Sequence, residues 1–563
     1  MLDLLVTGGT VVDGTGAPAR RADIGVADGR IVRLGAHLGT AATTIDAGGF
    51  VVCPGFVDVH THYDAQLLWD PTASPSPLHG VTTILGGNCG FTIAPIAPEH
   101  VDYIRRMMAR VEGMPLSALD GAWDWSTFGS WLDRLDGRVA VNAGFLVGHS
   151  TIRRVAMGEA SGGPATAEQV AAMVAMVHEA LGAGALGFSS SLGQAHTDGD
   201  GAPVPSRAAD RDEILALCRA VRDHEGTTIE FIPAVGEIGV ELADLMADMS
   251  LAANRPLNWN LLGSLSPVEI YEGQLAASDV AAERGAVVVA LTLPDLMRLR
   301  SDALLRSLPG WRDVVRLDGE ARRRAVADPA IRRQLHEGVD TARARGLGAM
   351  ADWDLVEVAE GRWAGCTVAA VGTALDVDPV DVLIDVVLPD NLPLTTVLPS
   401  LLPSLGATDE GWRRRVAVWK DPRVVLGGSD AGAHLDLMCH ANYPTVVLGE
   451  VVRQRGLLSL EEAVRMMTDV PARLYGLRDR GRIEEGAHAD LVVLDPDTVG
   501  SEAAHVRTDL PGGGYRLYAE AAGVSQVLVN GVPIVVEGTF TGAEPGTLLR
   551  SGRDTETRTV PGG

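Results

Sequence analysis

Two histidines separated by one residue follow an apolar run in residues 55–64, GFVDVHTHYD. Val57 and Val59 favour a β-strand, and alternate side chains of a strand point to the same face. His60 and His62 therefore share a face, roughly 6.5–7 Å apart along the strand. This spacing suits two imidazoles that bind one metal ion, although a pair of solvated histidines at a strand end fits the same pattern.

Other chemically useful side chains end or interrupt apolar runs. Cys89 ends VTTILGGNC, where it is either a zinc ligand or a buried inert thiol. Glu230 lies inside TTIEFI, and a buried carboxylate needs a partner such as a nearby cation. Asp430 follows RVVLGGS, with His434 just beyond; it fits a general base or a helix N-cap equally well. His149 ends VNAGFLVGH.

The segments that carry these residues alternate between strands and helices. Thr166 and Gln169 predict a helix start with reciprocal side-chain caps, as do Ser459 and Glu462. The strand-like run LGFSSS, which contains Ser190, follows the first of these helices. Such alternation predicts a parallel barrel or a doubly wound sheet, and in a barrel the chemistry lies at the C-terminal strand ends.

The two ends of the chain differ from the middle because both consist of short strands. Asp28-Gly29 and Asn530-Gly531 are hairpin turn signals between apolar runs. Each end alone has too few strands to bury a face. We therefore expect residues 1–52 and 481–545 to pack together as one small β-sandwich.

The remaining segments complete the predicted organisation. Residues 53–480 form the barrel, and residues from about 295 to 420, which are mainly helical and charged, form an insertion between its last two strands. The polar, glycine-containing segment 546–563 is expected to be a mobile tail.

Composition narrows the partners. The 563 residues carry a net charge of −26, with 46% hydrophobic and 21% charged residues. An acidic, globular chain is a poor match for nucleic acid or anionic membranes. No signal peptide or long apolar run is visible, and five scattered cysteines are typical of a reducing compartment. We therefore expect a cytoplasmic protein, a possible homo-oligomer, acting on a small molecule.

Six segments, read together, resemble one family: PGFVDVHTHYD, GVTTILGGNCG, VGHST, GALGFSSS, GGSDAGAH and GRIEEGAHADLVVLD. The ordered set is similar to the amidohydrolase superfamily, and the cysteine in GNCG makes it most similar to the N-acyl-D-amino-acid deacylase (D-aminoacylase) branch. The resemblance implies a distorted (β/α)8 barrel with metal ligands at strand ends. His60 and His62 match the first-strand pair, Cys89 the second-strand cysteine, and Asp430 the last-strand catalytic aspartate.

Two positions depart from the family pattern. The resemblance implies histidines at the ends of strands five and six, whereas this chain has Glu230 and Asn260, the latter with Asn258 as an alternative alignment. Glutamate can bind zinc through oxygen, but asparagine is a weak neutral ligand. We therefore expect one Zn²⁺ ion rather than two, with another divalent metal possible.

The resulting hypothesis is a metal-dependent amidohydrolase that cleaves the amide C–N bond of an N-acyl (D-)amino acid or a related small amide. Asp430 is the expected base, and His149 or His434 stabilises the developing oxyanion. Arg207, which follows a turn past the fourth strand, is the candidate for binding a substrate carboxylate. The expected metal ligands are His60, His62, Cys89, Glu230 and Asp430, and the expected substrate contacts are Arg207, Asn260 and Ser190.

Three alternatives stay open. The first is a hydrolase of cyclic amides or of another C–N substrate. The second is a serine hydrolase acting through GFSSSLG, which lacks the G-x-S-x-G nucleophile turn. The third is a binding or scaffold protein that kept the fold without the chemistry. Metal content separates the metal-dependent amidohydrolase from the scaffold protein: stoichiometric metal supports the enzyme, and its absence supports the scaffold.

Overall fold

The structure is a computed structural model. It describes residues 1–121, 123–233, 237–262, 268–293, 298–300, 305, 308–317, 319–344, 352–354, 356–358, 361–363, 366–390, 394–397 and 409–563.

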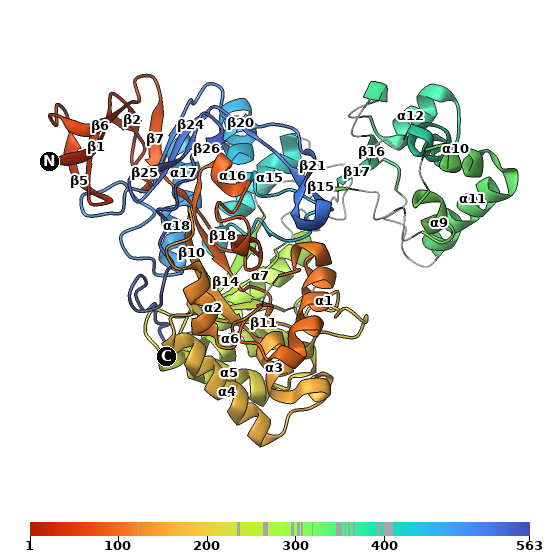
Figure 1. Cartoon of the computed structure of the whole chain (residues 1–563), viewed down its shortest axis with the longest axis horizontal. Helices are drawn as coiled ribbons and strands as arrows, with labels where there is room; N and C mark the ends of the chain where they lie inside the picture. The colour runs from red at the N-terminus through yellow and green to blue at the C-terminus, as the bar shows by residue number, and fades with distance from the viewer. Residues whose placement is uncertain are drawn as a thin grey trace.

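Eight parallel strands form the centre of the molecule (Figure 1). Their order in the sheet follows the chain, because each strand pairs with the one before it. The strands are β8 (Phe56–Asp58), β9 (Val81–Gly86), β10 (Asn142–Gly148), β11 (Gly187–Ser191), β12 (Thr228–Ile232), β13 (Leu257–Trp259), β14 (Val288–Thr292) and β18 (Val424–Leu426). All are buried on both faces, except for partial exposure within β14, as expected for a parallel sheet covered by helices.

The first and last strands meet beyond their C-terminal ends. The backbone N–H of His62 donates to the carbonyl of Ala431 at 2.7 Å, and that of Asp430 donates to the carbonyl of His60 at 3.1 Å. These bonds join the edges of the curled sheet next to the residues of chemical interest. The predicted distorted barrel is confirmed.

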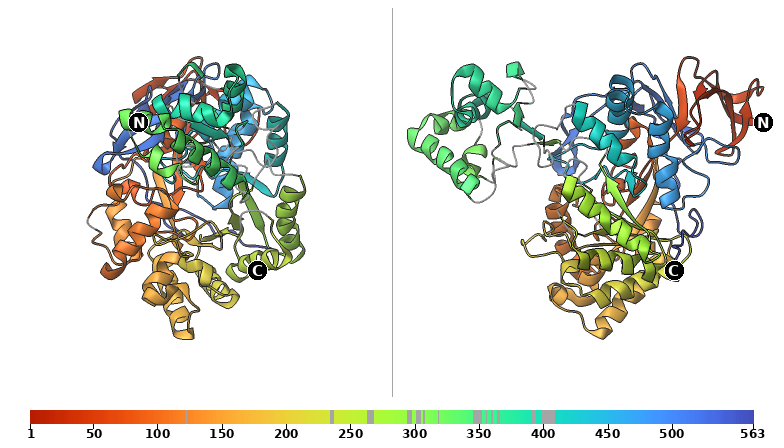
Figure 2. Two further views of the ribbon diagram at one scale, coloured as in Figure 1. Left: turned by 90° about the vertical axis from the view of Figure 1, so that its right-hand side faces the viewer. Right: turned by 180° about the vertical axis from the view of Figure 1, so that it is seen from behind.

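Helices cover the outer face of this sheet (Figures 1 and 2). The predicted reciprocal caps are confirmed at Thr166–Gln169 and Ser459–Glu462. In the described part of the chain, no helix has both the length and the apolar composition needed to cross a bilayer. The helices are α1 (Val101–Val111), α2 (Phe128–Leu135), α3 (His149–Met157), α4 (Ala167–Gly182), α5 (Arg211–Arg222), α6 (Val240–Ala253), α7 (Val268–Glu283), α15 (Asp409–Trp419), α16 (Tyr443–Val446), a π-helix (Val447–Gln454), α17 (Leu460–Met467) and α18 (Asp469–Leu474).

Strands from both termini form two further sheets. The first has the order β5 (Arg30–Gly35), β4 (Asp23–Ala27), β1 (Leu2–Thr7), β6 (Ala41–Asp46). The second has the order β26 (Thr539–Phe540), β25 (Val532–Val536), β24 (Val524–Val529), β19 (Leu491–Leu494), β7 (Val51–Pro54), β2 (Thr10–Val11), β3 (Arg20–Arg21).

The two sheets share one apolar core, which includes Leu4, Val52 and Leu491. The β-sandwich built from both termini is thus confirmed. Asp28 and Asn530 take positive φ angles of 50° and 47° at their hairpins, as two-residue turns with a following glycine require. We propose keeping 1–52 and 481–545 as the limits of this domain, since these limits enclose all but two residues of its strands, Cys53 and Pro54 of β7.

The segment between β14 and β18 carries the expected, mainly helical insertion. It has its own apolar core, which includes Trp311, Leu335 and Leu383, and it stands to one side of the barrel (Figures 1 and 2). Its elements are α9 (Arg312–Val315), α10 (Gly319–Ala327), α11 (Pro329–Ala344), α12 (Val368–Leu375), α13 (Pro379–Val382), a π-helix (Leu383–Val387), α14 (Leu388–Asp390) and the sheet β15 (Arg298–Arg300), β17 (Leu394–Val397), β16 (Val356–Val358).

Two small sheets complete the fold near the last barrel strand. They are β20 (Gly500–Ser501) with β23 (Ala521–Ala522), and the hairpin β21 (His505–Leu510) with β22 (Gly514–Tyr518). Leu517 of this hairpin donates its N–H to the carbonyl of Leu435, in the loop that follows β18.

The segment 546–563 is attached to the barrel instead of extending freely. Ala143 of β10 donates its N–H to Thr547 and accepts from Leu549, at 3.0 and 2.7 Å. Leu549 joins the apolar cluster of barrel strands that includes Val57 and Leu146. We expected a mobile tail because the segment is mostly polar. Composition alone does not show that two leucines are buried or that the backbone bonds to the barrel.

Candidate metal centre

His60 and His62 lie just after β8 and are 0% and 1% exposed. Between them, Thr61 points the other way and donates its hydroxyl to the carbonyl of Leu85. The two imidazoles therefore share a face, as strand alternation predicts. Their centroids are 5.3 Å apart and the rings meet edge to face.

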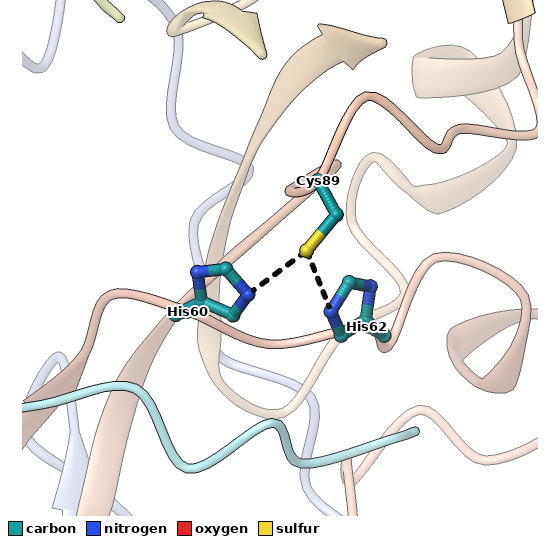
Figure 3. A group of neighbouring side chains, drawn as sticks. All are labelled: His60, His62 and Cys89. Carbon is teal, nitrogen blue, oxygen red and sulfur yellow. Dashed lines mark hydrogen bonds between the residues drawn. The ribbon is translucent and has the colours of Figure 1, made fainter. Parts of the chain in front are cut away.

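Cys89 reaches these rings from the loop after β9 (Figure 3). Its Sγ is 3.3 Å from His60 Nε2 and 3.9 Å from His62 Nε2. The backbone of Cys89 has a φ of 58°, a left-handed conformation that costs a non-glycine residue free energy. The amide of Asn88 supports the loop by donating to the carbonyls of Thr61 and Leu85.

Asp430 adds a carboxylate from the loop after β18. Its Oδ1 lies 3.0 Å from His62 Nε2 and 3.5 Å from His60 Nε2, and its Oδ2 lies 3.6 Å from His434 Nε2. Asp430 and His434 also have positive φ angles, of 59° and 49°. Strained backbone at both loops that meet the histidines is typical of a functional site.

Glu230 and Asn260 approach His60 on different sides. Glu230 Oε1 is 3.8 Å from His60 Nδ1, and Oε2 accepts the backbone N–H of Cys89 at 2.9 Å. The amide nitrogen of Asn260 is 3.4 Å from His60 Nε2. Asn258 instead bonds to Ile229 and Tyr475, so Asn260 is the residue that reaches the site. Glu230 lies beside the nitrogen of His60 that points away from Cys89.

Burial shifts the pKa values of these groups strongly. It lowers the pKa of His60 to about 3 and raises that of Glu230 to about 8. Burial alone would lower the pKa of His62, but Glu112 and Asp430 outweigh it and raise that pKa to about 10. Burial and the nearby carboxylates raise the pKa of the Cys89 thiol. A site with this many buried acidic groups is stabilised by a cation.

The donor set fits a divalent ion of the zinc type. The ligand atoms of His60, His62 and Cys89 lie within 4.8 Å of one another, and Asp430 Oδ1 adjoins them. Two imidazoles, a thiolate and a carboxylate suit Zn²⁺ better than Mg²⁺ or Ca²⁺, which prefer oxygen. Glu230 Oε1 is buried with no hydrogen-bond partner, a deficit that charge at the site can offset.

Comparison with known proteins is consistent with this geometry. The model of the amidohydrolase family matches residues 43–351 and 404–535. This chain belongs to the amidohydrolase family.

Proteins similar to this amidohydrolase align with almost its full length. D-aminoacylase from Alcaligenes xylosoxydans xylosoxydans is 30% identical over 97% of each chain, and N-acyl-D-aspartate deacylase from the same organism is 30% identical over 98% of this chain and 95% of its own. A D-aminoacylase structure described as having a binuclear metal centre, with one-metal activation and second-metal attenuation, is 26% identical. It covers 98% of this chain and 100% of its own, with a TM-score of 0.65.

His149 and Ser190, both expected at the reaction centre, belong to a different network in this amidohydrolase. His149 Nδ1 is 2.8 Å from Ser190 Oγ, and Nε2 is 2.9 Å from Glu213 Oε1. Arg153 donates to the same glutamate. Because both ring nitrogens are engaged, His149 has no N–H to offer an oxyanion. The structure thus corrects both expectations: Ser190 and His149 link β11 to α3 and α5.

Arg207 supports the loop that follows β11. Its Nη1 donates to the carbonyls of Gln194 and His196 at 3.1 and 3.3 Å. A guanidinium held this way stiffens the loop, and its contact with a substrate carboxylate stays a prediction.

Sequence reasoning missed two residues that the fold brings to the site. Glu112, 2% exposed at the end of α1, places Oε1 3.3 Å from His62 Nδ1. His196 bonds through Nδ1 to Ser191 Oγ at 2.7 Å and packs edge-on against Phe91. Burial lowers the pKa of His196 to about 4, which the charge of Asp430 opposes. Glu112 directly follows the amphipathic helix α1, whose periodicity predicts the helix but not the direction of the next side chain. His196 comes from a loop with no periodic signal.

Proposed function

We propose that this amidohydrolase cleaves the amide C–N bond of an N-acyl-D-amino acid or a related small amide, using one divalent ion. The observation that carries the proposal is the buried cluster of His60, His62 and Cys89 with Asp430 beside it, at the C-terminal mouth of an amidohydrolase barrel. The resemblance of both whole-length relatives to this chain supports the substrate class.

We assign the metal ligands to His60, His62, Cys89 and Asp430, and we favour a single Zn²⁺ ion. Among the described residues, one group of three or more His, Cys, Asp or Glu side chains converges closely enough to hold an ion. Asp430 and Glu230 both lie outside this three-residue group. We propose Asp430 as the fourth ligand because its Oδ1 is within 3.5 Å of both Nε2 atoms, whereas Glu230 faces Nδ1 of His60; ligation by Glu230 stays a prediction. When bound, such an ion polarises a carbonyl and lowers the pKa of water.

The side chains around the cluster have separate tasks in the proposed reaction. Asp430 accepts the proton of the attacking water and delivers it to the leaving nitrogen. Its histidine neighbours hold its pKa well below the usual range, so it is ionised and ready to accept. His434, whose side chain is 33% exposed beside it, donates to the oxyanion. Asn260 offers an amide for a polar substrate group.

A small pocket adjoins Asp430. Its wall includes the apolar side chains of Leu435, Met438 and Leu517. Arg516 also lines it, but Asp509 holds that guanidinium through two bonds of 2.8 Å. A neutralised arginine among apolar side chains favours an apolar substrate group over an acidic one. We propose that this pocket receives the side chain or acyl chain of the substrate.

The test is release of free amino acid by the zinc-loaded protein from N-acetyl-D-leucine, N-acetyl-D-methionine and N-acetyl-D-glutamate, with the L-enantiomers in parallel. We expect turnover of the apolar D-substrates, loss of turnover after chelation and recovery with Zn²⁺. Stoichiometric zinc with turnover of cyclic amides alone would replace the proposal by the cyclic-amide alternative. Absence of stoichiometric metal after reconstitution would favour the scaffold alternative.

A further inference from the structure

Each ligand histidine has a buried carboxylate on the side opposite the donor cluster. For His62, Nε2 faces Asp430 and Cys89, whereas Nδ1 lies 3.3 Å from Glu112 Oε1. Neither His62 Nδ1 nor Glu112 Oε1 has a hydrogen-bond partner, and both residues are at most 2% exposed. His62 Nδ1 and Glu112 Oε1 are therefore the natural hydrogen-bond partners of each other, because a buried polar atom left without a partner is costly.

Glu230 occupies the equivalent place behind His60 and has a second contact. Its Oε1 lies 3.8 Å from His60 Nδ1, and its Oε2 accepts the N–H of Cys89. The carboxylate of Glu230 thus lies beside two proposed metal ligands: His60 at the end of β8, and the backbone of Cys89 in the loop after β9. Glu112 also contacts two parts of the site. Its carboxylate faces His62, and its backbone carbonyl accepts the N–H of His434 in the loop that carries Asp430.

We propose that Glu112 and Glu230 are positioning residues that fix the ring orientation and tautomer of His62 and His60 for metal binding. An imidazole that binds a metal through Nε2 donates Nδ1–H, and a carboxylate acceptor raises the basicity of the ligating nitrogen. The separations of 3.3 and 3.8 Å exceed an N–H···O bond of about 2.9 Å, so the proposal requires each pair to close to hydrogen-bond distance when the ligated ring donates Nδ1–H. This inference rests on the proposed metal site.

The experiment compares the Zn²⁺ affinity of wild type, Glu112→Gln and Glu230→Gln in competition with a chromophoric chelator. We expect each variant to bind about 10- to 100-fold more weakly, the effect typical of outer carboxylates on ligand histidines. Glu213→Gln is the matched control, because Glu213 is also buried and bonded to a histidine, His149, that is no ligand. Its affinity should equal that of wild type.

Two further readouts separate positioning from ligation and from general loss of structure. Cobalt(II) absorption reports the thiolate and the coordination number: Glu230→Gln should keep the wild-type bands, and altered bands would make Glu230 a ligand. In a His62→Ala background, Glu112→Gln should weaken affinity no further, because Glu112 acts through that ring. A further loss there, or wild-type affinity in the single variants, would overturn the inference. Failure of wild type itself to bind zinc would instead refute the metal site.

Discussion

Replacement of Asp430 by asparagine tests the proposed chemistry most directly. Asp430 contacts three imidazole nitrogens, with distances of 3.0, 3.5 and 3.6 Å, so its carboxylate is ionised throughout the working pH range. The asparagine side chain has nearly the same shape and can still accept hydrogen bonds, but it cannot accept the proton of the attacking water. The substitution therefore removes charge and basicity while leaving the packing of the loop in place.

The expected loss follows from the role of a positioned base, which contributes about 10²–10⁴ to the rate. At 1.36 kcal/mol per tenfold change, this is about 3–5 kcal/mol of transition-state stabilisation. We therefore expect kcat/KM of Asp430→Asn to fall about 100- to 10,000-fold at saturating zinc. Zinc in excess is essential to the assay because Asp430 also contributes a donor, so the affinity for the ion should fall as well.

The assay measures kcat/KM for the best N-acyl-D-amino acid alongside zinc bound per chain. Asp436→Asn is the control, since Asp436 lies in the same loop and loses the same charge. Its charge acts on His434, so this variant shows the effect of removing loop charge near His434 while the carboxylate beside His60 and His62 is kept. A fall of less than about tenfold in the zinc-saturated Asp430→Asn protein would refute the assignment of Asp430 as the base. An equal fall in Asp436→Asn would show that the effect comes from the net charge of the loop.

Three further predictions address the metal, the tail and the pH dependence of stability. Cys89→Ser should lower zinc affinity, measured by chelator competition, because a hydroxyl replaces a thiolate ligand; unchanged affinity would remove Cys89 from the ligand set. Leu549→Ala should cost about 2–5 kcal/mol in denaturant unfolding, since Leu549 is 1% exposed in the barrel cluster, whereas zinc affinity should stay the same. Burial lowers the pKa of His79 from 6.5 to about 4, so the unfolded chain binds more protons there and stability falls as pH drops from about 6.5 to 4, by about 3 kcal/mol in all. His79→Gln should flatten that part of the pH–stability curve of the apo protein, and an identical slope would contradict the assignment.

The strand ends were the part of the site that sequence could predict. His60, His62, Cys89 and Asp430 each follow an apolar run, and parallel strands bring such ends to one edge. His149 and Ser190 follow the same rule, yet they face the helix layer, because two helices supply Glu213 and Arg153 as partners. A strand end alone therefore does not tell which side of the barrel wall a side chain faces.

Loops account for most of what sequence could not predict. Glu112 lies just past the end of the periodic helix α1, and His196 lies in a loop without periodicity, so only the folded backbone shows where they point. The same applies to the 546–563 segment, whose two leucines are too few to give a pattern. The fold class was easier, because strand–helix alternation and turn residues repeat along the chain and each repetition supports the others.

The position of β18 has a consequence for the synthesis of the chain. Seven barrel strands leave the ribosome in succession, but the strand that closes the sheet follows only after the whole insertion between Thr292 and Val424. Until then the nascent sheet has two unpaired edges, β8 and β14, which are the edges most prone to pair with other chains. His60, His62 and Cys89 are already present at that stage, whereas Asp430 arrives with the closing strand. The chain thus acquires the proposed thiolate and imidazole ligands early, and the carboxylate that we propose as the base comes into place only as the barrel closes.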